Sequence, residues 1–439
     1  MERYSEYKDS GIYYIPLIPS SWNVLKGKIL FKEEKRPIRQ QDEIVTCFRD
    51  GQVTLRKNRR LEGFTNSLKE IGYKGIRKGD LVIHNMDAFA GAIGVSDSDG
   101  KGTPVYAVCT PIREDVNQYY YCFLLRFLAK IGFIQSLAKG IRERSTDFRY
   151  GDFKELLLPV PSRAEQDAIV RYLDAATSKI DKAIAMQQKM IDLLNERKQI
   201  IIQNAVTKGL DENVEMKDSG VEWIGMIPKH WEMKAIKYLK NTCKNAFVDG
   251  PFGSNLKSDH YVENGDVYVI ESGFITTGKF IYKDFKTITK EHFKTINRSE
   301  CIEGDIIIAK IGAKYGMAAI LPKLDKKSVV SGNSLKLTLD ESKMLSKYFV
   351  FLMSCFKEND GFKNIVQESA QPALSLGGLN NLKIPYPPIE EQKKVLCMVM
   401  PQCNEIDSAI TNCQRQIALL QERKQIIINE VVTGKVKVS

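Results

Sequence analysis

Mostly apolar residues recur at alternating steps of four and three residues in two stretches of the chain. The first stretch contains Ile180, Ile184, Gln187, Ile191, Leu194, Lys198, Ile201 and Ala205, and the second contains Ile406, Ile410, Cys413, Ile417, Leu420, Lys424, Ile427 and Val431. This spacing, sustained over about four heptads, predicts a long helix with a coiled-coil seam in each stretch. We expect the two seams to pair with each other in antiparallel direction, because a globular region adjoins each helix. Docking of each seam on a different subunit is the alternative.

Prolines and acidic residues indicate where these helices begin. Glu165-Gln166 and Glu391-Gln392 follow prolines and are expected to open a shorter helix ahead of each long one. Pro401 is expected to break the second of these shorter helices, because proline lacks the amide hydrogen that a helix interior needs. The long helices are therefore expected after about residue 177 and about residue 402, each about 45 Å long.

The regions before the helices have the pattern of strands. Short β-branched runs separated by Gly, Asp and Asn predict strands over about residues 12–115 and 224–340. Stretches rich in aromatic and aliphatic residues predict a short helix over 117–128 and another over 343–356.

The chain repeats itself. Lys8-Asp9-Ser10-Gly11 returns as Lys217-Asp218-Ser219-Gly220, and the segment ERKQIII at 196–202 returns at 422–428. The chain is thus one unit of roughly 210 residues present twice, with about 16 extra residues in the second copy between Trp231 and Gly304. The predicted fold class is α+β: two similar mixed α/β domains, pseudo-two-fold symmetric, separated by an antiparallel coiled coil of two long helices. The predicted domains are 1–160 and 211–386, and the predicted helical regions are 161–210 and 387–439.

Composition and charge narrow the class of protein. No apolar run is long enough to span a bilayer, and the N-terminus has no apolar segment typical of a secretory signal. Nine cysteines without a CxxC pair argue against a disulfide framework or a structural zinc site, which favours a cytoplasmic protein. A net charge of +11 favours a polyanionic partner, although charge alone is a weak signal.

No catalytic or metal site is predicted. Gly273–Lys279 matches the start of a phosphate-binding loop, but Phe280 stands where the motif requires Ser or Thr. Glu196 and Lys198 imitate the E-x-K of some nucleases but lie on a predicted long helix, where a solvated helix face is the simpler interpretation. The four histidines are scattered, and the cofactor and active-site loops of a DNA methyltransferase are absent from the sequence. We expect a non-catalytic protein.

Basic and amide residues in the unmatched middle of each copy are the candidates for DNA contact. In the first copy they are Arg56, Lys57, Arg59, Arg60, Arg142 and Arg144; in the second they are Lys257, Lys310, Lys314, Tyr315 and Gln371. Such side chains can pair with phosphates or read base edges. The alternative interpretation is that they are charges and amides that only keep the protein soluble.

The order of these motifs resembles that of the specificity subunits of type I restriction-modification enzymes. The resemblance is carried by Lys8–Trp22, Lys217–Trp231, Leu158–Gln166, Ile384–Gln392 and the two ERKQIII segments. Asp249–Ser254 resembles the start of a target-recognition domain of that family, which adds Ser254 to the candidate DNA contacts. The first copy departs from the pattern at Ser162-Arg163, where the second has Pro388-Ile389.

The resemblance implies a DNA-binding subunit of a restriction system with no cofactor or catalytic residue of its own. It implies that each target-recognition domain reads one half of a bipartite site on double-stranded DNA, and that the helices set the spacing and dock two methyltransferase (modification) subunits. DNA methylation with S-adenosylmethionine and cleavage with ATP and Mg²⁺ would be carried out by the methyltransferase and the restriction (motor-nuclease) subunits. A non-catalytic scaffold and a stand-alone DNA-binding regulator are the rival hypotheses, and a neighbouring methyltransferase reading frame would count against both.

Overall fold

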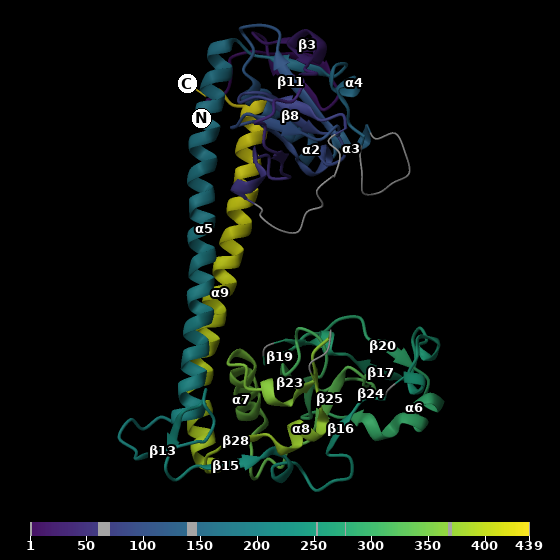
Figure 1. Ribbon diagram of the computed structural model, residues 1–439, viewed down its shortest axis with the longest axis vertical. Helices are drawn as coiled ribbons and strands as arrows, with labels where there is room; N and C mark the ends of the chain where they lie inside the picture. The colour runs from purple at the N-terminus through teal and green to yellow at the C-terminus, as the bar shows by residue number, and fades with distance from the viewer. Residues whose placement is uncertain are drawn as a thin grey trace. The chain divides into compact units, whose positions relative to one another are not determined.

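The computed structural model describes residues 2–59, 71–137, 147–251, 253–276, 278–367 and 371–438. The chain forms two compact units. Unit 1 comprises Met1–Gln188 and Gln414–Ser439, and unit 2 comprises Lys189–Cys413. Each unit therefore contains one β-rich domain and one part of each long helix (Figure 1). No helix among the described residues is both long and apolar enough to cross a membrane.

A four-stranded antiparallel sheet forms the centre of the domain in unit 1. Its order is β4 (Phe31–Glu33), β11 (Tyr106–Pro111), β8 (Leu81–His84) and β9 (Ile93–Val95). Smaller pairs surround it: β1 (Tyr7–Ile12) with β2 (Ile15–Pro19), β3 (Asn23–Lys26) with β12 (Leu157–Val160), β5 (Val45–Cys47) with β6 (Val53–Leu55), and β7 (Lys74–Ile76) with β10 (Gly100–Gly102). The helices are α1 (Gly27–Leu30), α2 (Gln118–Lys130), α3 (Phe133–Ser136) and α4 (Tyr150–Phe153).

Unit 2 contains the matching sheet and a second one. The matching sheet has the order β16 (Phe247–Asp249), β25 (Ser334–Leu337), β22 (Ile306–Ala309) and β23 (Ala318–Ile320). The second has the order β20 (Lys286–Ile288), β17 (Val267–Ile270), β24 (Lys327–Val330) and β21 (Glu300–Cys301), with β17 and β24 parallel. Smaller pairs are β13 (Met216–Asp218) with β14 (Met226–Pro228), β15 (Glu232–Ala235) with β28 (Lys383–Tyr386), β18 (Ile275–Thr276) with β19 (Lys279–Phe280), and β26 (Val366–Gln367) with β27 (Ala373–Leu374). The helices are α6 (Lys290–Ile296), α7 (Ser346–Glu358) and α8 (Leu376–Asn381).

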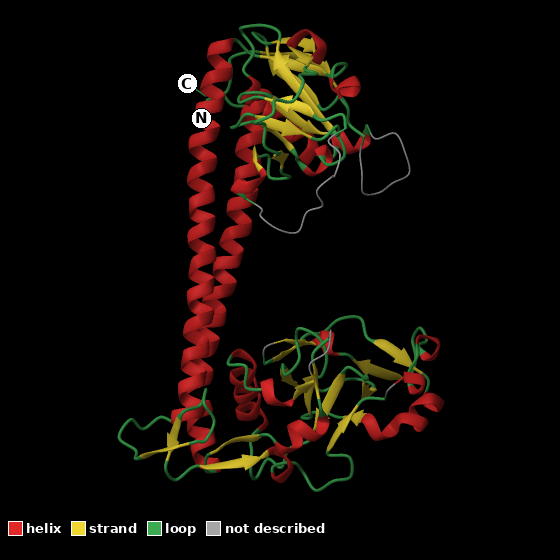
Figure 2. Ribbon diagram, viewed as in Figure 1, coloured by secondary structure: helices red, strands yellow, loops and turns green. Residues whose placement is uncertain are grey.

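The predicted short helices are confirmed as α2 and α7, and each lies against its domain's sheet (Figure 2). Their apolar residues have the spacing of one helical face. On α2, Tyr120, Tyr121, Leu124, Leu125 and Leu128 are fully buried; on α7, Tyr348, Phe349, Leu352, Met353 and Phe356 are buried in the same way. Each such side chain contributes about 1.5–3 kcal/mol by leaving water, so this face fixes the helix on the domain.

The long helices α5 (Arg163–Lys208) and α9 (Ile389–Val432) begin earlier than the sequence predicts. The separate shorter helix expected ahead of each, and the starts expected after about residues 177 and 402, are wrong, because each helix is continuous from its N-terminus. Pro401 lies inside α9 and does not end it. Proline costs a helix interior about 3 kcal/mol. Burial of Val395, Val399, Cys403 and Ile406 on either side of Pro401 offsets that cost.

Within each unit the two long helices pack together in antiparallel direction. In unit 1, Ile169 and Leu173 near the start of α5 share a hydrophobic cluster with Val431 and Val432 at the end of α9. In unit 2, Ile202 and Val206 near the end of α5 share a cluster with Val395 and Val399 near the start of α9. All positions of the two predicted seams are buried or half-buried. The α+β fold class, with two β-rich domains and two packed long helices, is confirmed.

Candidate nucleic-acid interface

The repeated Glu-Gln motif fixes each domain to the start of a long helix. In unit 1, Gln166 is fully buried; its Oε1 accepts from the backbone N–H of Asn117 at 2.8 Å, and its Nε2 donates to the carbonyl of Asp115 at 3.0 Å. The indole Nε1 of Trp22 donates to Glu165 Oε1 at 3.2 Å. The start of α5 is thereby fastened to the start of α2 and to the first strands.

Unit 2 repeats this arrangement with its own residues. Gln392 Oε1 accepts from the backbone N–H of Leu345 at 2.9 Å, and its Nε2 donates to the carbonyl of Lys343 at 2.9 Å. Trp231 Nε1 donates to Glu391 Oε2 at 2.8 Å. The Trp and Glu-Gln positions of the motifs that carry the sequence resemblance thus form the same structural joint in both units.

Each domain also receives the end of the other repeat's helix. In unit 1 the hydroxyl of Tyr120 donates to the carbonyl of Val432 at 3.0 Å, and in unit 2 that of Tyr348 donates to the carbonyl of Val206 at 3.3 Å. Gly434 and Gly209 follow these helix ends with φ of 73° and 76°, a left-handed conformation that glycine adopts without strain. Each lies against the tryptophan of the receiving domain.

The turn between β22 and β23 collects several of the predicted DNA-contact residues of unit 2. The backbone N–H of Gly312 donates to the carbonyl of Pro372 at 3.1 Å, and that of Leu374 donates to the carbonyl of Lys310 at 2.9 Å. These bonds bring the turn that contains Lys310, Lys314 and Tyr315 beside the segment that begins at Gln371. Lys310, Lys314 and Tyr315 therefore lie on a turn beside the loop of Gln371, which is distant from them in sequence.

These four side chains differ in exposure. Lys314 and Gln371 are exposed, whereas Tyr315 is half-buried under the ammonium group of Lys357, which lies 3.5 Å from its ring centroid. Lys310 is only 9% exposed, and its Nζ lies 3.4 Å from Asp249 Oδ2. Lys310 is therefore already engaged at the base of the turn, while Lys314 and Gln371 face solvent.

Ser254 and Lys257 lie on the loop that follows β16, and both are exposed. This loop is fixed to α6 because His292 Nε2 lies 3.0 Å from the carbonyl oxygen of Asn255. Within the loop, His260 Nδ1 accepts from the backbone N–H of Lys257 at 3.1 Å. Asp249, at the end of β16, bonds to Lys310 and to Arg298 Nη2 at 3.2 Å. Asp249 thus connects this loop to the β22–β23 turn, and sequence reasoning did not find Arg298.

The equivalent turn of unit 1 lies between β8 and β9. The backbone N–H of Phe148 donates to the carbonyl of Asn85 at 3.1 Å, the counterpart of the bond from Leu374 to Lys310 in unit 2. Burial lowers the pKa of His84 at the end of β8, and its Nδ1 accepts from the backbone N–H of Asp87 at 3.2 Å. Arg142 and Arg144 lie outside the described residues.

The predicted basic cluster of unit 1 is partly neutralised by the fold. Arg56 donates from Nε to Thr46 Oγ1 at 3.2 Å, Lys57 pairs with Glu43 at 2.5 Å, and Arg59 pairs with Asp50 at 2.7 Å. Arg60 lies outside the described residues. Surface ion pairs of this kind contribute about 0–1 kcal/mol, so a phosphate can replace their carboxylates at little cost.

The repeated Gly-Asp pair that precedes β8 and β22 is also structural. Asp80 is buried; it accepts from the backbone N–H of Arg77 at 2.7 Å and pairs with Arg36. Asp305 is buried and accepts from the backbone N–H of Ile302 at 2.8 Å. Among the described residues, no group of three or more His, Cys, Asp or Glu side chains is placed to hold a metal ion.

Comparisons with known proteins agree with this architecture. Residues 253–412 match the family model described as the type I restriction modification DNA specificity domain. The chain is 27% identical over 333 residues to the type I restriction enzyme MjaVIII specificity subunit of Methanocaldococcus jannaschii, covering 74% of this chain and 71% of that protein. It is 24% identical over 447 residues to the putative type I restriction enzyme MjaX specificity subunit of the same organism, covering 95% and 97%.

A solved structure shares the fold. One chain of a structure of the type I R-M system, described for its complex assembly and conformational transition, superimposes with a TM-score of 0.70 over 95% of this chain and 99% of that one, at 13% identity. The repeated joints, the paired long helices and these similarities agree with one another: residues 253–412 match a type I DNA specificity domain, and most of the chain is similar to specificity subunits of type I restriction enzymes.

Proposed function

We propose that this chain is the DNA specificity subunit of a type I restriction-modification system, and that each of its β-rich domains reads one half of a bipartite site on double-stranded DNA. The observation that supports the proposal is that both domains contain the same four-stranded sheet and helix, with different side chains at the turn between the last two strands of the sheet. The turn of unit 1 has Phe89 and Ala90 where unit 2 has Lys314 and Tyr315, although the flanking Ala and Gly of the turn are the same in both. Two equal frameworks with different loop residues suit the reading of two different sequences.

The proposed contacts are the residues predicted from sequence. They are Arg56, Lys57, Arg59, Arg60, Arg142 and Arg144 for the first half-site, and Ser254, Lys257, Lys310, Lys314, Tyr315 and Gln371 for the second. The exposure of Lys314, Gln371, Ser254 and Lys257 supports a direct role for these four. The burial of Lys310 against Asp249 favours a role in shaping the turn that presents Lys314.

We further propose that α5 and α9 set the spacing between the half-sites and dock two methyltransferase subunits. Antiparallel packing supports the spacing role, as does the 46-residue length of α5, about 70 Å at 1.5 Å per residue. In this proposal residues 1–160 and 211–386 are the recognition domains, and 161–210 and 387–439 are the spacer. The methyltransferase subunits would use S-adenosylmethionine, and restriction subunits, where they join the complex, would use ATP and Mg²⁺.

Mapping of modified adenines tests this proposal. The full-length chain is co-expressed with the methyltransferase subunit from the neighbouring reading frame, and the host genome is sequenced by a single-molecule method. We expect modified adenines in one gapped motif that disappears when this chain is omitted. A contiguous motif would contradict reading by two domains. Site-specific DNA binding without any methyltransferase partner would favour a stand-alone regulator, and absence of both binding and modification would favour a scaffold.

A further inference from the structure

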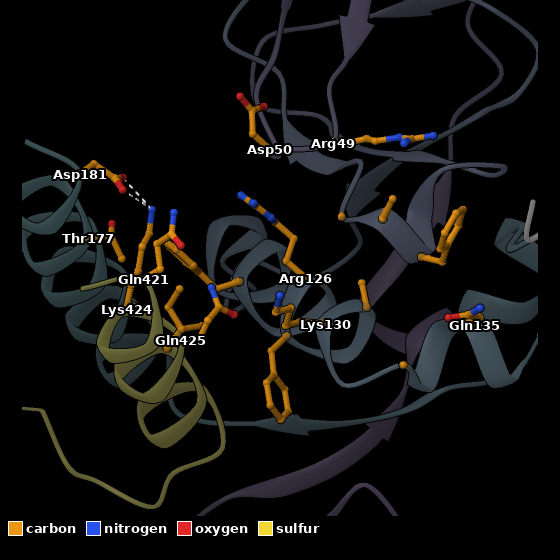
Figure 3. Close-up of a pocket in the computed structure, with 18 of the residues that line it drawn as sticks. Arg49, Asp50, Arg126, Lys130, Gln135, Thr177, Asp181, Gln421, Lys424 and Gln425 are labelled. Atoms are coloured by element: carbon orange, nitrogen blue, oxygen red, sulfur yellow. Dashed lines mark hydrogen bonds and ion pairs between the residues drawn. The ribbon is translucent and has the colours of Figure 1, made fainter. Parts of the chain in front are cut away.

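A polar cavity of about 880 Å³ lies in unit 1 between α2, the β8–β9 turn and the paired helices. Its wall carries the cations Arg49, Arg126, Lys130 and Lys424 and the anions Asp50 and Asp181 (Figure 3). The side chains of Gln421, Gln425 and Thr177 also line it. A cavity with this lining suits a charged ligand better than an apolar one.

Most of these charges already have partners. Lys424 Nζ lies 2.7 Å from both carboxylate oxygens of Asp181. Asp50 pairs with Arg59 at 2.7 Å, and Arg49 pairs with Asp87 at 2.9 Å. These pairs use up the carboxylates of the wall.

Arg126 and Lys130 are the two cations of the wall that these pairs do not include. They lie one helical turn apart on α2, and Figure 3 shows Arg126 extending from the helix into the cavity. Arg126 is half-buried and Lys130 is exposed, and within the described part of the chain no carboxylate pairs with either. The cavity therefore has two cations in excess of its internal pairs.

The equivalent place in unit 2 holds a smaller cavity. Its volume is about 230 Å³, and it is lined by Lys198, Lys279, Lys347 and Asp407, among others. Lys279, on the β18–β19 hairpin, places its Nζ 2.9 Å from Asp407 Oδ2. α7 carries Ser354 and Glu358 at the positions that match Arg126 and Lys130.

The two sites thus differ in both size and charge. In unit 2 a second lysine, Lys279, binds the carboxylate of Asp407, and α7 has no cation at the two matching helix positions. Unit 1 leaves a larger cavity open, and its helix presents an arginine and a lysine there. The cation pair belongs to the open site, which points to an anion that comes from outside the chain.

We propose that this cavity binds backbone phosphates of the DNA beside the half-site read by the first domain, with Arg126 and Lys130 as the contacts. The inference rests on the proposed function and adds a phosphate-binding surface to it. Phe89, Ala90 and Gly91 of the β8–β9 turn form part of the cavity wall, so the cavity adjoins the turn that matches the recognition turn of unit 2. Arginine and lysine are the side chains that neutralise DNA phosphates.

Salt-dependent DNA binding of the full-length chain, co-purified with its methyltransferase subunit, tests the inference. The probe is a fluorescent duplex that contains the gapped motif modified when the two proteins are co-expressed. The test variant is Arg126→Gln with Lys130→Gln, which keeps the side-chain stems. The control is Lys179→Gln with Lys182→Gln, which removes the same charge from exposed positions of α5 in the same unit, outside the cavity wall.

We expect the double variant to keep the same preferred sequence but to bind with a weaker salt dependence. Each lost phosphate contact should make the slope of log K against log salt about 0.9 shallower, so the expected change is about 1 to 2. The control should change the slope by clearly less. Arg126→Lys alone should keep most of the wild-type slope, and thermal unfolding of each variant shows whether it is folded.

Three results overturn the inference, each in a distinguishable way. A slope equal to that of the wild type in a folded variant removes the phosphate role. Loss of methyltransferase co-purification by the folded double variant, but not by the control, would assign the cavity to an acidic segment of that subunit. If co-expression of the wild-type proteins modifies no gapped motif, the proposed function fails and this inference fails with it.

Discussion

The two long helices form one Lys–Asp ion pair in each unit, and substitution of the aspartate can be compared between the two units. Lys198 Nζ lies 2.7 Å from Asp407 Oδ1 in unit 2, and Lys424 Nζ lies 2.7 Å from Asp181 in unit 1. Asp407 and Lys424 follow Asp181 and Lys198 by the same 226 residues that separate the ERKQIII segments. The two pairs are therefore copies of one interaction, and Asp181→Asn is the natural control for Asp407→Asn.

The environments of the two carboxylates predict different losses. Asp181 is 56% exposed and binds one lysine, whereas Asp407 is 27% exposed and binds both Lys198 and Lys279. An exposed pair contributes about 0–1 kcal/mol, and a hydrogen bond to a charged group in a less exposed place contributes about 1.5–3 kcal/mol. We expect Asp407→Asn to destabilise its unit by about 2 kcal/mol and Asp181→Asn to destabilise its unit by about 0.5 kcal/mol.

The pH dependence of the loss follows from the pKa of Asp407. Burial raises the pKa of Asp407, but the hydrogen bonds and charges of Lys198 and Lys279 together lower it by more. The net shift of the pKa is therefore downward from the ordinary 3.8. A carboxyl group with a lowered pKa stabilises the folded state above its unfolded pKa, and this stabilisation is lost as the pH falls through the folded value. The difference between the wild type and Asp407→Asn should therefore be full at neutral pH and shrink below a pH of about 4.

Hydrogen exchange read by mass spectrometry is the suitable assay, because a two-unit chain need not unfold in one step. Peptides from 189–208 and 389–413 report on unit 2, and peptides from 163–188 and 414–432 report on unit 1. A loss of 2 kcal/mol corresponds to exchange about 30 times faster through local opening. Equal acceleration by the two variants, or greater acceleration by Asp181→Asn, would refute the argument from exposure and partner number.

Three further predictions address the joint, the spacer and the basic cluster. Gln166→Ala or Gln392→Ala should lower the free energy of unfolding by about 2–4 kcal/mol, because each leaves buried backbone groups without a partner. Thermal unfolding measures the loss, and a decrease in melting temperature no larger than that of Gln187→Ala on the seam would contradict this prediction. Removing one heptad from both long helices should shorten the gap between the two half-sites by about three base pairs, since seven residues span about 10.5 Å. The bases read in each half-site should stay the same. An unchanged gap in the map of modified adenines would argue against the spacing role of the helices. Replacing the cations of residues 56–60 with alanine should weaken binding to the first half-site and flatten the salt slope by about one per lost phosphate contact; an unchanged slope would assign them to solubility.

The spacing of apolar residues predicted the helices correctly because each helix buries only one of its faces. The seams repeat every three or four residues, and α2 and α7 bury a face with the same period, so that local sequence carries the pattern. The effect of Pro401 was predicted wrongly because the compensating contacts are tertiary. Val395 and Val399 pack against residues of α5 nearly 200 positions earlier in the chain. A local rule for proline does not include them.

The candidate site was less predictable for a related reason. Lys310, Lys314, Tyr315 and Gln371 come together only through backbone bonds between two loops. Lys310 proved to be buried against Asp249, and no spacing in the sequence distinguishes it from the exposed Lys314. Arg126 and Lys130 were missed because they lie within an apolar helix, where two isolated cations give no sequence signal. Comparison of two equivalent sites in three dimensions was needed to single them out.

The structural joints also explain why the two copies agree at their ends and differ in their middles. The side chains of Gln166 and Trp22 each bond to another element, so substitution of either leaves a polar partner without its hydrogen bond. Lys314 and Gln371 lie on exposed loops, where substitution costs little stability. In such a molecule the matching residues maintain the framework, and the residues that differ between the copies are free to specify what each domain binds. Apart from Ser254, the sequence signals that carry the resemblance are therefore distinct from the residues proposed to read DNA.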